Sequence, residues 1–162
     1  IGTAEKLAAH EQGLLHRAFS VFVFNHSQEL LLQQRSTTKY HCGGLWTNTC
    51  CSHPIIKEPT IVTAKKRLQY EMGVSADLSY AGVFTYKAEF ANGLIEHEID
   101  HVYIANVANI IPEINPEEAE QYKWISISDL KDQLSKTPQL FTPWLPQSLE
   151  IASTKLLTQR NS

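Results

Sequence analysis

Two long alternating segments joined by a turn dipeptide constrain the fold of this chain most strongly. Residues 80–90 and 94–107 are rich in β-branched and aromatic residues, and Asn92-Gly93 lies between them. This arrangement strongly predicts a β-hairpin. Alternate side chains of a strand share one face, so the second segment places three carboxylates together, those of Glu96, Glu98 and Asp100. Like charges at this spacing are unfavourable unless a cation lies between them, and a metal ion would serve.

The rest of the chain predicts further strands. We expect strands over 18–24 and 29–35, joined as a hairpin by the turn at 25–28. Residues 46–53 are typical of a short strand that runs into a loop, and 121–125 form another short strand.

Three helices are predicted from apolar spacing and end signals. The clearest begins at Pro59-Thr60 and ends at Gly73, with an apolar stripe of Ile61, Ala64, Leu68 and Met72. Ser128 is expected to cap a brief helix over 129–134. The last helix opens at Pro143-Trp144, with a stripe of Leu145, Leu149, Ala152 and Leu156. Hairpins followed by helices that pack on the sheet indicate an α+β fold.

The composition is that of one globular domain spanning residues 1–162. Of the residues, 43% are hydrophobic and 19% are charged, and the net charge is −3. No basic run favours nucleic acid, and no apolar run approaches the roughly 18 residues of a membrane span. The chain starts at Ile1 without a signal-peptide pattern, and we expect a trimmed N-terminus.

The cysteines argue against a disulfide framework. There are three, Cys42, Cys50 and Cys51, and two are adjacent. Neighbouring residues of a strand face opposite sides, so the adjacent pair is poorly placed to form a bridge. We therefore expect a reducing, cytoplasmic setting.

Residues 46–54, Trp-Thr-Asn-Thr-Cys-Cys-Ser-His-Pro, carry the residue types needed for catalysis. They place the Cys51 thiol two residues from the His53 imidazole. A cysteine becomes a useful nucleophile or proton carrier when its surroundings tune its pKa, and a nearby histidine is one way to do so. The alternative is a buried cysteine pair beside a surface histidine.

A mixed set of imidazoles and carboxylates could hold a metal ion. Its members are His10, His16, His53, Glu96 and Glu98. Such nitrogen and oxygen donors suit zinc, manganese or iron. The residues lie far apart along the chain, so their spacing alone is a weak signal.

Five segments together resemble type I isopentenyl-diphosphate isomerases over nearly the whole chain. They are residues 5–10, 16–20, 44–54, 96–100 and 142–144. The resemblance implies a Nudix-like fold, with a mixed sheet of antiparallel hairpins packed between helices. It also implies an isomerase of isoprenoid biosynthesis that interconverts isopentenyl and dimethylallyl diphosphate. That reaction is an antarafacial protonation and deprotonation through a tertiary carbocation.

The resemblance further implies a role for each site residue. One tightly bound zinc or manganese ion would be held by His10, His16, His53, Glu96 and Glu98. A magnesium ion on the substrate diphosphate would be held by Glu71 and the Cys51 carbonyl. The diphosphate oxygens would be bound by Lys6, Arg35, Lys39 and Arg67. We expect a monomer that binds neither nucleic acid nor membranes.

Four residues would act on the five-carbon tail of the substrate. Cys51 and Glu98 would be the two acid/base groups. Tyr86 would lie beside the glutamate, and Trp144 would face the developing cation. A two-residue turn at Asn92-Gly93 would put Tyr86 and Glu98 on opposite faces. We therefore predict a three-residue loop or a bulge in this hairpin.

One departure from the Nudix hydrolases weakens the closest rival function. Their helix carries Arg-Glu-x-x-Glu-Glu, whereas residues 66–71 here read Lys-Arg-Leu-Gln-Tyr-Glu, so only Glu71 remains. Hydrolases use that carboxylate cluster to hold several divalent ions and to activate water. A Nudix-type diphosphohydrolase is therefore disfavoured. A non-catalytic zinc-binding module, in which Cys51 merely packs, stays open.

Overall fold

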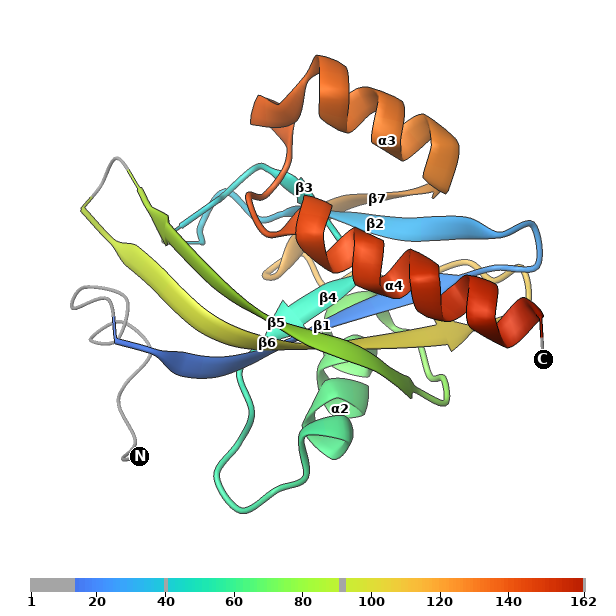
Figure 1. The fold of residues 1–162 in the computed structure, drawn as a ribbon, viewed down its shortest axis with the longest axis horizontal. Helices are drawn as coiled ribbons and strands as arrows, with labels where there is room; N and C mark the ends of the chain where they lie inside the picture. Colours follow the sequence, from blue (N-terminus) through green and yellow to red (C-terminus); the bar gives the residue numbers. More distant parts are fainter. Residues whose placement is uncertain (1–13, 40, 91–92, 162) are drawn as a thin grey trace.

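The computed structural model describes residues 14–39, 41–90 and 93–161 (Figure 1). The expected site residues Lys6 and His10 lie outside these ranges. The strands are β1 (His16–Phe24), β2 (Glu29–Arg35), β3 (Trp46–Thr47), β4 (Cys50–Ser52), β5 (Ser79–Glu89), β6 (Ile95–Asn106) and β7 (Ala119–Ser126). The helices are α2 (Thr60–Met72), α3 (Ile127–Lys136), the 3₁₀ turn η1 (Pro138–Leu140) and α4 (Leu145–Arg160).

The strands form one mixed sheet in the order β3-β2-β1-β6-β5, with β4 paired to β1 and β7 paired to β2. β1 runs parallel to β6 along its whole length, from His16↔Glu98 to Phe24↔Asn106. The expected hairpin of β1 and β2 is confirmed only beside its turn, where Phe24 pairs with Leu30. The two strands then diverge, because β2 takes β7 and β3 as neighbours while β1 takes β6 and β4.

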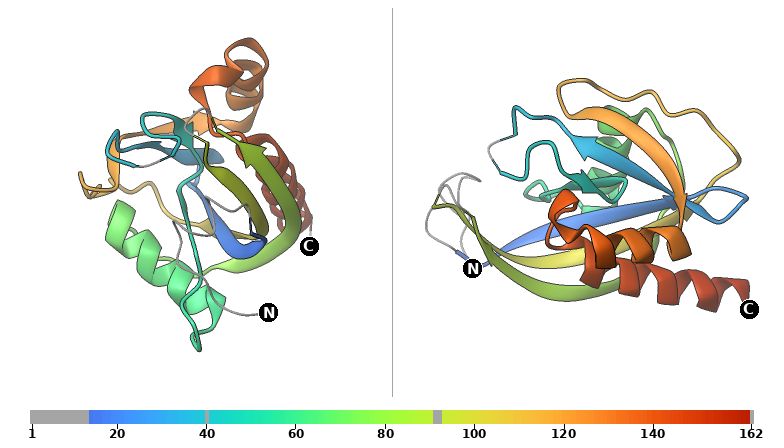
Figure 2. Two further views of the ribbon diagram at one scale, coloured as in Figure 1. Left: turned by 90° about the vertical axis from the view of Figure 1, so that its left-hand side faces the viewer. Right: turned by 90° about the horizontal axis from the view of Figure 1, so that it is seen from above.

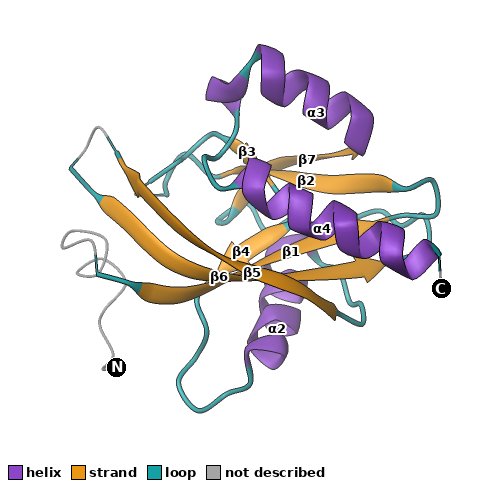
Figure 3. Cartoon of the chain, in the orientation of Figure 1, coloured by secondary structure: helices purple, strands orange, loops and turns teal. Residues whose placement is uncertain are grey.

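Helices α2 and α4 cover opposite faces of the sheet (Figures 2 and 3). The α2 stripe packs on Phe19 and Val21 of β1, and the α4 stripe packs on Phe22 and Phe24. β1 is apolar almost throughout because both of its faces are buried. Both predicted helical stripes are confirmed, and so is the α+β arrangement.

The β5–β6 hairpin resolves the conflict over Tyr86. Tyr86 pairs directly with Glu98, and the Phe90 N–H donates to the Leu94 carbonyl at 2.9 Å. Phe90 and Leu94 are therefore the last paired residues of the hairpin, and three residues lie between them, as predicted. A register shift between Tyr80 and Gly82 marks a bulge in β5. The three carboxylates of β6 share one buried face, and this prediction is also confirmed.

The predicted cap of the short helix is wrong. Ser126, not Ser128, caps α3: its hydroxyl accepts a hydrogen bond from the Asp129 N–H at 3.1 Å. Strand β7 runs straight into the helix, so Ser126 still has extended backbone and is the only one of the two serines in cap position. Among the described residues, no helix has both the length and the apolar composition needed to cross a bilayer.

Gly73 offers a test of how α2 is held. It ends α2 in the left-handed region at φ 64°, and a Cβ there would lie 2.6 Å from the Glu113 Cβ and 2.7 Å from its carbonyl oxygen. We expect Gly73→Ala to lower the free energy of unfolding by about 2 kcal/mol or more, measured by urea titration. The control is Gly93→Ala, at φ 83°, where the added carbon meets no atom within 4 Å among the described residues apart from its chain neighbours, and which should lose only about 1 kcal/mol. Equal losses would show that the contact with Glu113 is not restrictive.

Candidate active site and metal centre

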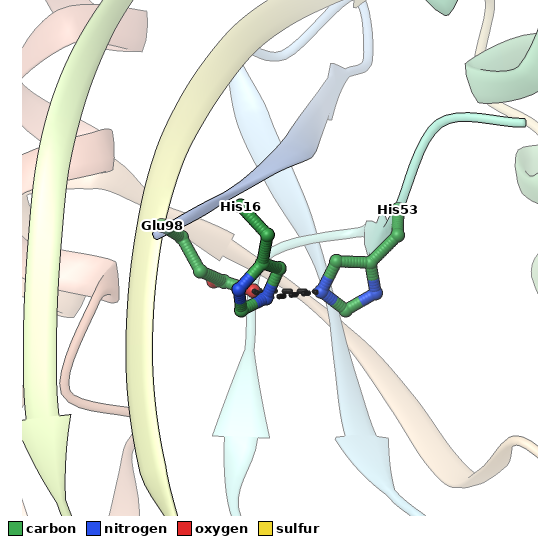
Figure 4. A group of neighbouring side chains, drawn as sticks. All are labelled: His16, His53 and Glu98. Atoms are coloured by element: carbon green, nitrogen blue, oxygen red, sulfur yellow. Dashed lines mark hydrogen bonds and ion pairs between the residues drawn. The ribbon is translucent and has the colours of Figure 1, made fainter. Parts of the chain in front are cut away.

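Two imidazoles and a carboxylate converge at one end of the β1–β6 pair. His16 begins β1 and is the direct partner of Glu98 on β6, while His53 follows β4. The Glu98 Oε2 lies 3.1 Å from the His16 Nε2 and 2.7 Å from the His53 Nε2. The two Nε2 atoms are 3.1 Å apart, and Figure 4 shows the three side chains pointing toward one another.

The chemistry of this cluster fits a bound cation. The His16 Nδ1 donates to the Leu14 carbonyl at 2.8 Å, so a neutral His16 turns the lone pair of Nε2 toward Glu98. Two lone pairs at such a distance repel unless a proton or a metal ion lies between them. The donor atoms lie within 4.8 Å of one another. Tetrahedral zinc ligands at about 2.1 Å from the ion would be separated by roughly 3.4 Å, so little movement is needed.

Burial acts differently on the neighbouring carboxylates of β6. It opposes ionisation of Glu98, but the hydrogen bonds from His16 and His53 outweigh it and hold the pKa well below its usual range. Burial also raises the pKa of Asp100, and the Glu98 charge adds to that shift. Both effects favour the neutral form of Asp100, which lessens the repulsion that the sequence pattern predicts.

Glu96 takes a partner that sequence reasoning missed. Its Oε2 lies 2.6 Å from the Nε2 of His41, and both side chains are buried. Of the five proposed ligands, the structure thus brings together His16, His53 and Glu98, while Glu96 pairs with His41 nearby. His41 stands in a loop without periodicity, and only the three-dimensional packing of that loop reveals it.

Cys51 faces the same side of the sheet as the carboxylates. It pairs with Ser20 of β1, while Cys50 points into the apolar core on the other side. Burial raises the pKa of the Cys51 thiol to about 12, although the Arg35 guanidinium, 3.6 Å from the sulfur, acts in the opposite direction. At neutral pH the thiol therefore holds its proton. All three cysteines are free, as expected.

Cys51 and Glu98 line one pocket, as the sequence interpretation requires. The pocket spans about 410 Å³, including space open to solvent, and is also lined by Trp144 and Arg35. Tyr86 packs edge-on against Trp144 with ring centroids 6.0 Å apart. Among the described residues, the Tyr86 hydroxyl has no hydrogen-bond partner.

Basic side chains gather at the same pocket. Arg35, Lys39 and Arg67 all line it. Arg67 donates to Glu71 at 2.6 Å and to Glu118 at 3.1 Å, and Lys39 also pairs with Glu118. The Gln33 amide donates to the other oxygen of Glu71 at 3.1 Å. The Cys51–Glu98 pocket thus contains a cationic subsite, formed by Arg35, Lys39 and Arg67, next to the buried Glu71 of helix α2.

Asn48 fixes the strand that carries Cys51. Its amide nitrogen donates to the carbonyl oxygens of Cys50 at 2.8 Å and Val21 at 3.2 Å. Its side-chain oxygen accepts from the Trp144 indole at 3.2 Å and from the Thr47 hydroxyl at 2.9 Å. Asn48 is buried, so its polar atoms depend on these four hydrogen bonds rather than on water. One side chain therefore positions both β4, which carries Cys51, and the Trp144 indole ring.

Comparison with known proteins decides the family. The NUDIX domain family matches residues 14–145. An isopentenyl-diphosphate Delta-isomerase of Serratia proteamaculans is 49% identical over 144 residues, covering 89% of this chain and 80% of the relative. Isopentenyl-diphosphate Delta-isomerase 2 of Aromatoleum aromaticum is 46% identical over 150 residues, covering 93% and 79%. The chain belongs to the isopentenyl-diphosphate Delta-isomerase family.

Solved structures confirm the fold expected of an isopentenyl-diphosphate Delta-isomerase of the Nudix type. The NUDIX domain of Shewanella oneidensis NrtR, complexed with ADP ribose, has a TM-score of 0.68 at 19% identity, covering 96% of this chain and 99% of that one. The MutT protein from Methanosarcina mazei Go1 has a TM-score of 0.65 at 16% identity, covering 91% and 96%. At such identities these neighbours establish the architecture alone.

The Asn48 network predicts a large effect from a nearly isosteric change. Asn48→Asp replaces the donor amide with an oxygen, so the carbonyls of Val21 and Cys50 lose their partner and a charge is buried. We expect the free energy of unfolding at pH 7 to fall by about 2–4 kcal/mol. Urea titration measures this.

The matched control is Asn106→Asp. Asn106 is exposed at the end of β6 and should change stability by no more than about 0.5 kcal/mol. An Asn48→Asp variant as stable as this control would contradict the role given to the network.

Proposed function

We propose that this protein interconverts isopentenyl and dimethylallyl diphosphate by antarafacial proton transfer, with Cys51 and Glu98 as the two acid/base groups. The observation that carries the proposal is that the two side chains come from different strands and line one pocket. Their pKa shifts are opposite: the thiol is protonated and the carboxylate is ionised. One proton donor and one proton acceptor are what a double-bond shift needs.

The diphosphate would be anchored at the cationic subsite. Arg35, Lys39 and Arg67 line the pocket and would bind its oxygens, together with Lys6. In this structure Glu118 pairs with both Lys39 and Arg67, so a diphosphate would replace that carboxylate. Glu71 and the Cys51 carbonyl would hold the accompanying magnesium ion. Binding energy from the unreacting diphosphate can then hold the apolar tail in the pocket.

The apolar end of the pocket suits a carbocation. Protonation at C4 and deprotonation at C2 proceed through a tertiary cation, which water would trap as an alcohol. The Trp144 ring already has a cation near it, since the Arg35 guanidinium carbon lies 5.5 Å from its centroid. A desolvated cation–π contact contributes on the order of 2 kcal/mol. Tyr86, paired with Glu98 and packed on Trp144, would stand beside the proton transfer.

The metal centre would hold the carboxylate in place. We propose that the ligands are His10, His16, His53, Glu96 and Glu98, with zinc or manganese as the ion. When bound, such an ion supplies a fixed positive charge that orients a carboxylate and tunes its proton affinity. Glu98 would then act on the substrate from a fixed position, and His16 would keep its tautomer through the bond to Leu14.

The geometry of α2 supports isomerisation over diphosphate hydrolysis. Within the motif, Gln69 accepts from Ser75, and Tyr70 packs on the Arg67 guanidinium. Only Glu71 offers a carboxylate, and it already accepts hydrogen bonds from Gln33 and Arg67. A simple zinc-binding module would not account for Cys51 in a pocket lined by basic residues.

We also propose that the protein acts as a cytoplasmic monomer and binds neither nucleic acid nor membranes. The three free cysteines suit a reducing compartment. The net charge of −3 does not favour nucleic acid.

The thiol can be tested directly. We expect Cys51→Ala to abolish conversion of isopentenyl diphosphate to dimethylallyl diphosphate, because no proton donor then remains on that side. Chromatography of the products measures turnover and also detects released phosphate. The control is Cys50→Ala on the same strand, which removes a core thiol and should keep turnover per folded molecule. Wild-type-like turnover by Cys51→Ala would rule out the assigned role, and phosphate release by the unaltered protein would favour the hydrolase.

Metal removal gives an independent test. Treatment with a strong chelator should remove one tightly bound ion and lower activity by at least about 100-fold, and zinc or manganese should restore it. Elemental analysis before and after treatment measures the ion. Full activity in a metal-free preparation would contradict the site at His16, His53 and Glu98.

A further inference from the structure

His41 forms a buried contact with Glu96 that no part of the proposed mechanism uses. Its Nε2 lies 2.6 Å from the Glu96 Oε2, and the two side chains are only 4% and 2% exposed. The pair lies in the wall of the pocket that holds Cys51 and Glu98. A hydrogen bond of this length between an imidazole and a carboxylate is a strong one.

The loop between β2 and β3 fixes the position of His41. The imidazole packs against Phe90 with centroids 5.6 Å apart and against Trp144 at 6.4 Å. The His41 carbonyl accepts a hydrogen bond from the Arg35 guanidinium at 3.4 Å. Gly43 closes the turn where a Cβ would lie 3.1–3.3 Å from three backbone carbonyl oxygens. The ring therefore has little freedom to leave Glu96.

We propose that His41 is a positioning residue that orients the Glu96 carboxylate for the metal centre. This inference rests on the proposed function, in which Glu96 is a ligand. The bond is made to the Glu96 Oε2, so it restrains the rotation of the carboxylate. Carboxylates that bind metals are commonly held by such a second partner, and its loss typically costs 10–100-fold in affinity.

A hydrogen-bond donor on Glu96 is favourable because of its neighbour on the strand. Glu98 stands two residues away on the same buried face. Carboxylates at this spacing repel each other when both are charged, so a donor on one of them lowers the cost of placing them together. His41 supplies such a donor from the loop between β2 and β3.

The experiment compares two substitutions of His41 whose side-chain amides differ in length. In His41→Gln the side-chain nitrogen can take the place of Nε2, whereas in His41→Asn it falls short of Glu96. Co²⁺ is added to the full chain after metal removal, and its affinity is measured by competition with a chromophoric chelator. The visible absorption of the bound Co²⁺ reports the ligand geometry. Circular dichroism confirms that each variant is folded.

We expect His41→Asn to bind Co²⁺ about 10–100-fold more weakly with an altered spectrum, and His41→Gln to recover most of the affinity. The control, His26→Gln, changes an exposed imidazole in the β1–β2 turn and should match the unaltered protein. His41→Phe, which can pack on Phe90 and Trp144 but has no donor, should behave like His41→Asn and replaces it if that variant does not fold.

Two results in the variants would overturn the inference. One is unaltered Co²⁺ affinity and spectrum in a folded variant that lacks the donor. The other is a loss in His41→Gln as large as in His41→Asn, which would mean that the donor does not matter. If the unaltered protein itself binds no Co²⁺, the proposed metal centre fails and this inference fails with it. Normal Co²⁺ binding without isomerisation would instead overturn only the activity.

Discussion

The burial of three carboxylates on one face of a single strand is the constraint on which the rest of this structure depends. Glu96, Glu98 and Asp100 are all nearly inaccessible to water, and such a row cannot carry three unpaired charges. Each has a different environment: Glu98 contacts two imidazoles, Glu96 contacts His41, and Asp100 accepts a hydrogen bond from Ser20 while burial raises its pKa. The parallel pairing of β1 with β6 makes the first solution available, because it places His16 directly opposite Glu98.

The elements around β1 bring the proposed acid/base groups and the basic side chains to one pocket. Strand β4 packs on the other edge of β1 and brings Cys51 to the carboxylate face, so thiol and carboxylate flank one pocket. The basic residues come from β2, its following loop and helix α2, and two of them, Lys39 and Arg67, meet at Glu118. The proposed acid/base groups and the proposed diphosphate-binding residues thus come from different strands, loops and helices around that pocket.

Much of this could be predicted from local patterns, and the exceptions have physical causes. Alternation along β6 correctly grouped its carboxylates, and helical spacing found the buried faces of α2 and α4. Ser128 was mistaken for the cap because two serines lie two residues apart and only the backbone shows which is extended. The length over which β1 and β2 pair was overestimated, since the sequence does not show that the two strands diverge to pair with other strands.

The site itself required more than spacing. His16, His53 and Glu98 are separated by 37 and 45 residues along the chain, so only the family resemblance could group them before the fold was known. His41 escaped because its contact with Glu96 depends on the packing of an irregular loop. The side of the sheet on which Tyr86 lies was predicted only because its expected role requires the same face as Glu98.

If Cys51 and Glu98 are the two acid/base groups, the proton added at C4 must come from a group that exchanges with solvent. The direct measurement is to incubate the metal-loaded protein with isopentenyl diphosphate in D₂O and follow the product by NMR. The account predicts dimethylallyl diphosphate that carries solvent deuterium in the methyl group derived from C4, with no phosphate released. Product without solvent deuterium, or inorganic phosphate in place of the isomer, would contradict it.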